Sequence, residues 1–366
     1  MARLQIEGLC KGWDFPVIDE LDLEVEEGEF FTIVGPSGIG KTTLLRLIAG
    51  LEMPDAGIVR VGNTDVTDKP PYDRNVAMTF ESYALYPHLT VFENIASPLR
   101  ARRMAKAQVT EQVEKIAELL RITPLLGRKP GEISGGQKQR TALGRTLVAS
   151  PDIFLLDEPL SHLDAKIRHA LRQQFHTLKE LRAVATVYVT HDYAEALSLG
   201  DRIGVMNAGK LVQVGTARDL FERPNSLFVA QQLGQPGINV LSCTLGDQAQ
   251  TVVVQGTEVV FPVAPQHRQI LARLPNKVLK LGVRPQHLEV VANGKAADKS
   301  VLDARVVLFE ALGAAGVLQA EIKGIGLTAL TSPDIAHDHG QPVRLKVAAK
   351  NFLYFHPDTG ASLIDD

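Results

Sequence analysis

The sequence is poor in several features that place proteins in common classes. It has two cysteines, Cys10 and Cys243, far apart and without a C-x-x-C partner, so they indicate thiols of a reducing compartment rather than a disulfide or metal pair. No apolar run approaches the roughly 20 residues that a membrane-spanning helix needs, and the start at Met1 lacks a signal-type apolar core. The net charge is −3 with both signs interspersed, which disfavours nucleic acid as a partner. We expect a soluble, cytoplasmic protein.

What the sequence has is enough length and apolar content for more than one domain. Its 366 residues, 45% of them hydrophobic, suffice for two or three domains with proper cores. Residues 3–34 alternate apolar and polar in short runs, which predicts strands. Residues 97–128 change to helical spacing, as in Val109, Val113 and Ile116, with charges on the other face. This pattern predicts an α/β domain with an inserted helical subdomain.

The C-terminal third has a different pattern. Gly234–Gly237 is a plausible linker, and the sequence beyond it has short β runs, such as Val301–Phe309, separated by turns. This favours an all-β barrel of the oligonucleotide/oligosaccharide-binding type. We therefore expect an α/β domain over residues 1–234, with its helical subdomain at about 88–150, and a β-barrel domain over 235–366.

The most specific signal is a glycine-rich stretch, Gly35 to Thr43, which reads G-P-S-G-I-G-K-T-T. It follows the apolar run Phe30–Val34 and opens into a helical pattern, which is the arrangement of a phosphate-binding loop. Its glycines let backbone N–H groups converge on a polyanion, and the helix N-terminus adds about half a positive charge. Lys41 is expected to reach the β and γ phosphates, and the Thr42 hydroxyl to bind Mg²⁺. The stretch predicts a nucleotide site.

Three later stretches supply further polar groups. Ser134–Gln137 precedes a helical pattern and is a second candidate phosphate cradle. The apolar run Ile153–Leu156 ends at Asp157 and Glu158, and an Asp at the carboxyl end of a buried parallel strand is the usual Mg²⁺ ligand beside a phosphate loop. Glu158 is a candidate general base, a role worth roughly 10²- to 10⁴-fold in rate. His191 also stands at a strand end, which favours a functional role.

Trp13 is the only tryptophan and lies in the loop between the first two β runs. Its ring offers a face on which adenine can stack. By position alone, a tryptophan that packs between surface and core fits at least as well. Both interpretations stay open from the residues alone.

Together, these motifs resemble the nucleotide-binding subunit of an ABC transporter. More narrowly, they resemble the ATPases of binding-protein-dependent importers of the maltose and sugar-phosphate type. The resemblance extends beyond the ATPase, because two C-terminal stretches are similar to the β appendage of this class. The motifs are the phosphate loop, I-S-G-G-Q at 133–137, Asp157-Glu158, S-H-L-D at 161–164, T-H-D at 190–192, S-Y-A-L-Y-P-H-L-T-V at 82–91, Leu281–Leu288 and Phe355–Gly360.

The resemblance implies a head-to-tail dimer that holds two ATP molecules, each with Mg²⁺, at its interface. It assigns catalysis to Glu158, His191 and Glu81, and Mg²⁺ binding to Thr42, Glu81 and Asp157. The other nucleotide contacts that it implies from the same chain are Trp13, Gly35, Pro36, Ser37, Gly38, Ile39, Gly40, Lys41, Thr42 and Thr43. The contacts that it implies from the second chain are Ser134, Gly135, Gly136, Gln137 and Asp164.

The resemblance also implies partners and a place in the cell. ATP binding and hydrolysis would drive two integral membrane permease subunits, fed by a periplasmic or extracellular solute-binding protein. The helical subdomain and residues 81–91 would dock to the permeases, at the cytoplasmic face of the cell membrane. A sugar, sugar phosphate or polyol is the expected solute. Importers of polyamine or ferric iron use similar ATPases, and a non-transport ATP-dependent switch is a further alternative.

The sequence departs from the family pattern at one position of the site. Glu81 stands where the family has glutamine, a residue thought to touch Mg²⁺ or the attacking water. A carboxylate there adds a negative charge, which favours a divalent cation and opposes the γ-phosphate. We expect Glu81 to change Mg²⁺ dependence and coupling more than ATP affinity.

Overall fold

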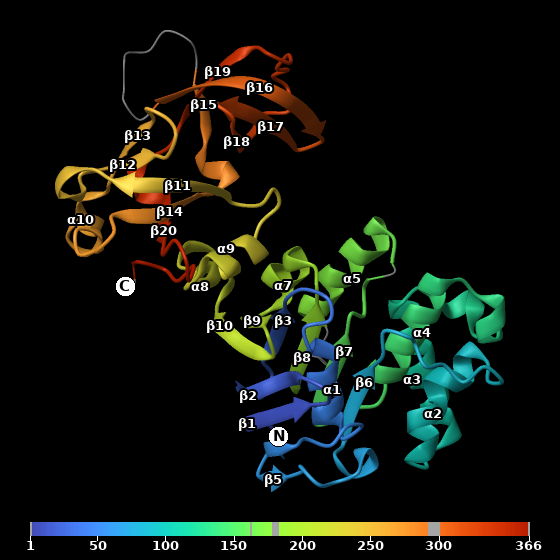
Figure 1. The fold of residues 1–366 in the computed structure, drawn as a ribbon. Helices are drawn as coiled ribbons and strands as arrows, with labels where there is room; N and C mark the ends of the chain where they lie inside the picture. Colours follow the sequence, from blue (N-terminus) through green and yellow to red (C-terminus); the bar gives the residue numbers. More distant parts are fainter. Residues whose placement is uncertain (1, 162, 178–182, 292–300, 365–366) are drawn as a thin grey trace. The chain divides into compact units, whose positions relative to one another are not determined.

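The computed structural model describes residues 2–161, 163–177, 183–291 and 301–364. The chain divides into two compact units, Met1–Asp219 and Leu220–Asp366 (Figure 1). The domain boundary expected after residue 234 lies inside the second unit. Each unit has buried hydrophobic clusters of its own, in agreement with the length and apolar content of the chain.

The first unit is built on a mainly parallel six-stranded sheet. Its strands follow the order β10-β9-β3-β8-β7-β6, and of these pairs only β9–β10 is antiparallel. β3, β7 and β8 are buried along their whole length. In such a sheet, ligands bind beyond the carboxyl ends of the strands. The strands are β3 (Phe30–Val34), β6 (Val76–Thr79), β7 (Ile153–Asp157), β8 (Ala185–Thr190), β9 (Arg202–Asn207) and β10 (Lys210–Gly215).

Alternate residues of the buried strands belong to two different cores, because successive side chains of a strand point to opposite faces. Phe154 and Leu156 of β7 pack into a helical cluster, whereas Ile153 and Leu155 pack into a cluster with the first helix and a second sheet. Continuous apolar runs are the consequence of this two-sided burial. The helices of this unit are α1 (Lys41–Ala49), α2 (Val91–Ala101), α3 (Lys106–Leu119), α4 (Gly135–Leu147), α5 (Ala165–Thr177) and α7 (Tyr193–Leu199).

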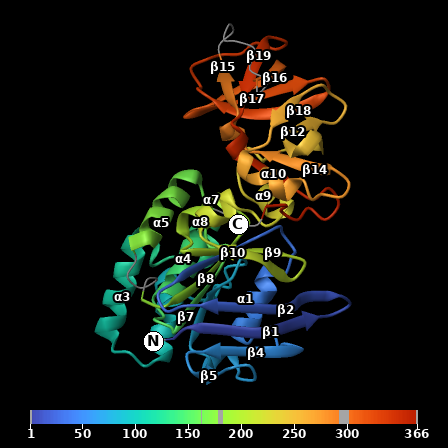
Figure 2. The same cartoon turned by 90° about the vertical axis from the view of Figure 1, so that its left-hand side faces the viewer.

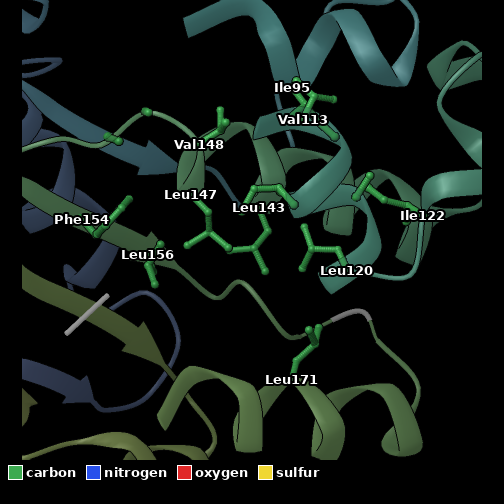
Figure 3. Close-up of a cluster of buried hydrophobic side chains, with 14 of the residues drawn as sticks. Ile95, Val113, Leu120, Ile122, Leu143, Leu147, Val148, Phe154, Leu156 and Leu171 are labelled. Carbon is green, nitrogen blue, oxygen red and sulfur yellow. The ribbon is translucent and has the colours of Figure 1, made fainter. Parts of the chain in front are cut away.

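The helical region lies beside β6 and β7, as α2, α3 and α4 show in Figure 1. In the close-up, Leu143 and Leu147 of α4 lie between Ile95 and Val113 on one side and β7 on the other (Figure 3). Apolar residues at helical spacing therefore form α3, as the sequence predicts. Among the residues that the structure describes, no helix is both long and apolar enough to cross a membrane.

A smaller antiparallel sheet of order β2-β1-β4-β5 packs against α1, and its strands run side by side in Figure 2. Gly57 has φ +93°, and a Cβ there would lie 2.5 Å from the carbonyl oxygen of Gly8. Only glycine lets β4 approach β1 so closely. The strands are β1 (Leu4–Gly12), β2 (Pro16–Val25), β4 (Ala56–Val61) and β5 (Thr64–Asp65).

The second unit is β-rich, which confirms the expected fold class. It contains two antiparallel five-stranded sheets, ordered β13-β12-β11-β14-β20 and β15-β19-β16-β17-β18, that share one hydrophobic cluster (Figure 1). Short helices, α8 (Ala217–Glu222), α9 (Leu227–Gln232) and α10 (Pro265–Leu271), accompany the sheets. The strands are β11 (Asn239–Leu245), β12 (Thr251–Val254), β13 (Val260–Pro262), β14 (Val278–Val283), β15 (Glu289–Val291), β16 (Val301–Leu312), β17 (Ala315–Ile322), β18 (Ile325–Thr331), β19 (Pro342–Lys346) and β20 (Phe352–Phe355).

Two buried polar side chains hold this unit together. Asn239 exchanges hydrogen bonds with Thr328 at 2.7 and 2.8 Å and thereby joins β11 of one sheet to β18 of the other. The Arg284 guanidinium donates to the carbonyls of Phe221 at 2.7 Å and Leu233 at 2.6 Å. Burial lowers the pKa of Arg284 to about 10. Its role is to fasten the segment around α8 and α9 to the end of β14.

Candidate functional site

The phosphate loop is a tight turn between β3 and α1. Gly40, the N-cap of α1, has φ 107°, and a Cβ there would lie 2.7 Å from the Val17 carbonyl oxygen. A Cβ at Gly35 would lie 2.6 Å from the Met206 carbonyl oxygen. No side chain caps the start of α1, so its first N–H groups are available to an anion. Close packing alone therefore requires glycine at positions 35 and 40.

Lys41 is buried at the first turn of α1 with 6% of its surface exposed. Its Nζ donates to the carbonyl oxygens of Gly35 and Pro36, both at 2.8 Å. Burial lowers the pKa of Lys41, while the nearby carboxylates Glu158, Asp157 and Glu81 act in the opposite direction. The ammonium group is thus held by the loop itself, at the position where the sequence predicts a contact with phosphates.

A cavity of about 430 Å³ opens above the loop, and we call it the phosphate cavity. Its volume is that of an ordinary small-molecule site. It brings the phosphate loop together with the three residues expected to act in catalysis, although these come from three separate parts of the sequence. The lining residues are Val17, Ser37, Gly38, Gly40, Lys41, Thr42, Thr43, Glu81, Glu158, Ser161 and His191.

Asp157 lies at the carboxyl end of β7, directly beside the loop. Thr42 Oγ1 donates to its Oδ1 at 3.1 Å, and the carboxylate is 2% exposed. Burial raises the pKa of Asp157 to about 6, against the hydrogen bond from Thr42 and in the same direction as the charges of Glu81 and Glu158. A buried carboxylate and a hydroxyl, with two more acids nearby, form a set of hard oxygen donors that fits Mg²⁺. Among the described residues no ready-made cluster of three or more metal-binding side chains exists.

Glu158 is held in an unusual backbone conformation. Its φ is 45°, in the left-handed region that costs a non-glycine residue about 1 kcal/mol or more and that is concentrated at functional sites. His191 Nδ1 lies 2.9 Å from Glu158 Oε2. Gln139 Nε2 and Ser161 Oγ both donate to the Glu158 carbonyl oxygen, at 3.1 and 3.0 Å. These contacts fix the direction in which the carboxylate points into the phosphate cavity.

Several predicted site residues lie outside the phosphate cavity. Ser134 is the N-cap of α4, where its Oγ and the Gln137 side chain form a reciprocal capping box. Asp164 Oδ1 accepts from the N–H of Ile167 at the start of α5. Gly135 begins α4 and is exposed. These groups are on the surface of the chain rather than at its own phosphate loop.

Trp13 is also outside the phosphate cavity, in the turn between β1 and β2. Its indole is 60% exposed, so it is not a core-packing residue within the part of the chain that is described. His162, which belongs to the S-H-L-D motif, lies outside the described residues. The structure therefore collects about half of the expected site residues in one cavity.

The sequence did not indicate two arginines that hold backbone segments near the site in place. Arg168 of α5 donates to the carbonyls of Ser161 and Leu163, and lies 3.8 Å from the buried Glu195. Arg145 of α4 donates to the carbonyls of Tyr83 and Ala84 at 3.0 and 2.7 Å, and so ties α4 to the loop that follows Glu81. No residue type marks such contacts, because their partners are backbone carbonyl groups, which every residue has.

Fold and site together define a P-loop ATPase of the ABC type, and comparisons with known proteins agree. The family model for ABC transporters matches residues 18–161. The chain is 38% identical to the sn-glycerol-3-phosphate import ATP-binding protein UgpC of Yersinia pseudotuberculosis, over 98% of this chain and 99% of the relative. It is 39% identical to the trehalose/maltose import ATP-binding protein MalK of Thermococcus litoralis, over 99% and 100%.

The chain therefore belongs to the ABC transporter ATP-binding proteins, and it is an ABC transporter ATPase. Among solved structures it resembles the dimeric MJ0796 cassette, a bacterial ABC transporter cassette, with 29% identity and a TM-score of 0.55 over 59% of this chain and 99% of that one. The same cassette has also been solved as a dimer in a post-hydrolysis state bound to ADP and Pi. The similarity covers 59% of this chain, and the relative is described as an ATP-binding cassette.

Proposed function

We propose that this chain hydrolyses ATP to drive the import of a sugar, a sugar phosphate or a related polyol through two membrane permease subunits. The observation that carries the proposal is the phosphate cavity, in which Lys41, Thr42, Glu158 and His191 line one space. Similarity to importer ATPases over nearly the whole chain, including the C-terminal unit, supports an importer over a non-transport switch.

In the proposed reaction, the phosphate loop binds the triphosphate. The free N–H groups at the start of α1 face the phosphates, and the Lys41 ammonium exchanges its loop carbonyls for phosphate oxygens. Thr42, Asp157 and Glu81 would hold Mg²⁺, which supplies positive charge that offsets the charge of the phosphates. The donor set beside Asp157 fits that ion because the site otherwise gathers negative charge.

Glu158 is the proposed general base. Its carboxylate takes a proton from the attacking water. This role requires the carboxylate to be held within hydrogen-bond reach of that water. His191, through Nδ1, restrains that carboxylate at 2.9 Å, and Gln139 restrains the backbone of the same residue. Glu158 follows β7 with a left-handed φ and lines the cavity, and such strain is concentrated at functional sites.

A second copy of the chain completes each site in this proposal. Ser134–Gln137 and Asp164 cap helices at the surface and do not line their own chain's cavity. The N-terminus of α4 offers N–H groups to an anion brought by another chain. The dimeric form of the MJ0796 cassette supports a dimer, and we propose that its two chains are arranged head to tail.

The proposed assembly adds two permeases at the cytoplasmic face of the cell membrane and a periplasmic or extracellular solute-binding protein. The relatives named for sn-glycerol-3-phosphate and for trehalose/maltose support a sugar or sugar-phosphate solute. The test is to purify the chain with its co-purifying membrane proteins and to measure which solute, with its binding protein, stimulates ATP hydrolysis. Stimulation by a sugar or sugar phosphate is expected. Stimulation only by a polyamine or ferric iron, or co-purification with no membrane protein, would contradict the proposal.

A further inference from the structure

Within the turn between β1 and β2, little holds the Trp13 side chain in one orientation. Trp13 N–H donates to the Phe15 carbonyl at 3.2 Å, which closes the turn between β1 and β2. The Trp13 and Phe15 side chains are 60% and 69% exposed. An indole on such a turn can point in several directions unless another element fixes it, because a side chain without packing neighbours keeps its rotamer freedom.

Asp55 supplies that fixation from another part of the chain. It lies immediately before β4, and its two carboxylate oxygens accept from Lys11 Nζ at 2.9 Å and from Gly12 N–H at 2.8 Å. The N–H of Asp55 donates to the Cys10 carbonyl at 2.9 Å. The hydrogen bond from Lys11, and next that from Gly12, holds the pKa of Asp55 below its ordinary value. A single residue thus binds the three consecutive residues that lead into Trp13.

Lys11 links the Asp55 carboxylate to the indole of Trp13. Its Nζ, held by Asp55, lies over the Trp13 ring at 5.4 Å from the centroid, within the range of a cation–π contact. The Lys11 side chain is only 14% exposed, so the ammonium is confined between the carboxylate and the ring. One face of the indole is thereby occupied by a cation, and the opposite face is the one that a ligand can use.

We propose that Asp55 and Lys11 are positioning residues that present the open face of Trp13 to the base of the bound nucleotide. The proposal rests on the proposed function and on the nucleotide contact at Trp13 that the family resemblance implies. Neither residue lines the phosphate cavity, so their effect reaches the nucleotide through the base and not through the phosphates. Affinity for ATP, rather than the hydrolysis step, depends on this pair.

The test compares ATP with inorganic tripolyphosphate, which has the phosphates but no base. Binding of both is measured on the full-length chain for wild type, Asp55→Asn, Lys11→Met, the double variant and Trp13→Ala, together with kcat at saturating ATP. Because Trp13 is the only tryptophan, its fluorescence reports the turn directly. Glu7→Gln is the matched control, since Glu7 accepts from Arg60 at 2.7 Å across the same pair of strands.

Trp13→Ala is expected to raise the Kd for ATP roughly fivefold to a hundredfold, the range for one base–aromatic stack. Asp55→Asn and Lys11→Met are each expected to raise it about threefold to tenfold, and the double variant no further than the larger single effect, as coupled residues do. Binding of tripolyphosphate, kcat and the Glu7→Gln variant should stay within about twofold of wild type. Tryptophan emission should shift in the Asp55 and Lys11 variants before nucleotide is added.

Two results would overturn the inference separately from the proposed function. If Trp13→Ala weakens ATP binding while Asp55→Asn and Lys11→Met do not, the indole stacks without the pair and the positioning role is wrong. If the pair weakens ATP and tripolyphosphate equally, the variants act on the fold or the phosphates, and the role is again wrong. If Trp13→Ala leaves ATP binding unchanged, the proposed base contact itself fails, whatever the pair does.

Discussion

The two units of this chain use buried polar groups for different purposes. In the first unit, Lys41 is buried in the lining of an open cavity, and Asp157 is buried behind the lining residue Thr42, next to further acids. In the second unit, Asn239 and Arg284 are also buried, but their side chains donate to backbone carbonyls. These hydrogen bonds join separate elements. A buried polar or charged side chain therefore does not by itself indicate a catalytic or binding site.

What distinguishes the two cases is the partner of each buried group. The Asp157 carboxylate accepts from one hydroxyl. Burial raises its pKa, and the neighbouring carboxylates act in the same direction, so the site is short of positive charge. Both terminal nitrogens of the Arg284 guanidinium donate to backbone carbonyls, and its Cζ lies 3.6 Å from the Phe221 ring centroid. An incompletely compensated charge beside a cavity indicates a ligand, and a compensated one indicates architecture.

The comparison is tested most strongly by Glu158→Gln. This change removes the proposed base while preserving the size of the side chain, so we expect ATP hydrolysis to fall at least about 100-fold with ATP binding retained. Single-turnover phosphate release and nucleotide binding measure the two effects. Glu310→Gln, at an exposed position of β16, is the control and should be neutral. A wild-type rate already at background would favour an ATP-binding switch instead.

Arg284→Met tests the architectural half of the comparison. Loss of the guanidinium leaves the carbonyls of Phe221 and Leu233 without their donor, so we expect the second unit to lose about 2–4 kcal/mol of stability. Urea denaturation followed by circular dichroism measures this loss. The ATPase rate per folded chain should be unchanged. A large loss of ATPase in chains that remain folded would show that this charge is not purely structural.

Glu81→Gln tests whether the charge of Glu81 in the phosphate cavity contributes to binding of the divalent cation. The change removes one negative charge near Asp157 and Thr42, so attraction to a divalent cation should weaken. We expect half-maximal ATPase at roughly threefold to tenfold higher Mg²⁺, with the Kd for ATP altered by less than about twofold. ATPase activity titrated with Mg²⁺ at fixed ATP is the measurement. Superimposable Mg²⁺ curves would show that Glu81 does not contact the ion.

The smallest expected effect concerns Glu195, a buried acid of α7. Its carboxylate accepts from Tyr188 Oη at 2.8 Å and Thr190 Oγ1 at 3.0 Å, and burial raises its pKa. A raised folded-state pKa stabilises the fold below the unfolded pKa, and this contribution is lost as pH rises through the folded value. Glu195→Gln should therefore gain stability relative to wild type between pH 4.5 and 7. Urea midpoints at both pH values test this, and a gain that does not change with pH would contradict it.

Much of the first unit could be predicted from the sequence. The strands β3, β7 and β8 are continuous apolar runs, and the turn chemistry of Gly35 to Thr43 is strictly local. Asp157 and Glu158 follow such a run directly, so their place at a strand end was also predictable. The positions of these residues were correct because each depends on neighbours within a few residues along the chain.

Other contributions could not be predicted in this way. Arg168, Arg145 and Gln139 act on carbonyl groups, which every residue has, so no residue type at the partner position signals the contact. The restraint on Trp13 through Asp55 joins residues more than 40 positions apart. The sequence left Trp13 open between packing and stacking, and its exposure in the structure decides against packing.

By itself, the sequence determined the kind of chemistry: a phosphate loop, a strand ending in two acids and a β-rich appendage, all encoded in local patterns of residue type. Only the tertiary structure decided which of these groups meet. The parallel sheet places the ends of β3, β7 and β8 at one edge, so that Lys41, Glu158 and His191 share one cavity while Ser134 faces outward. The reason is that strand order and register fix distances between segments, which spacing along the chain does not record.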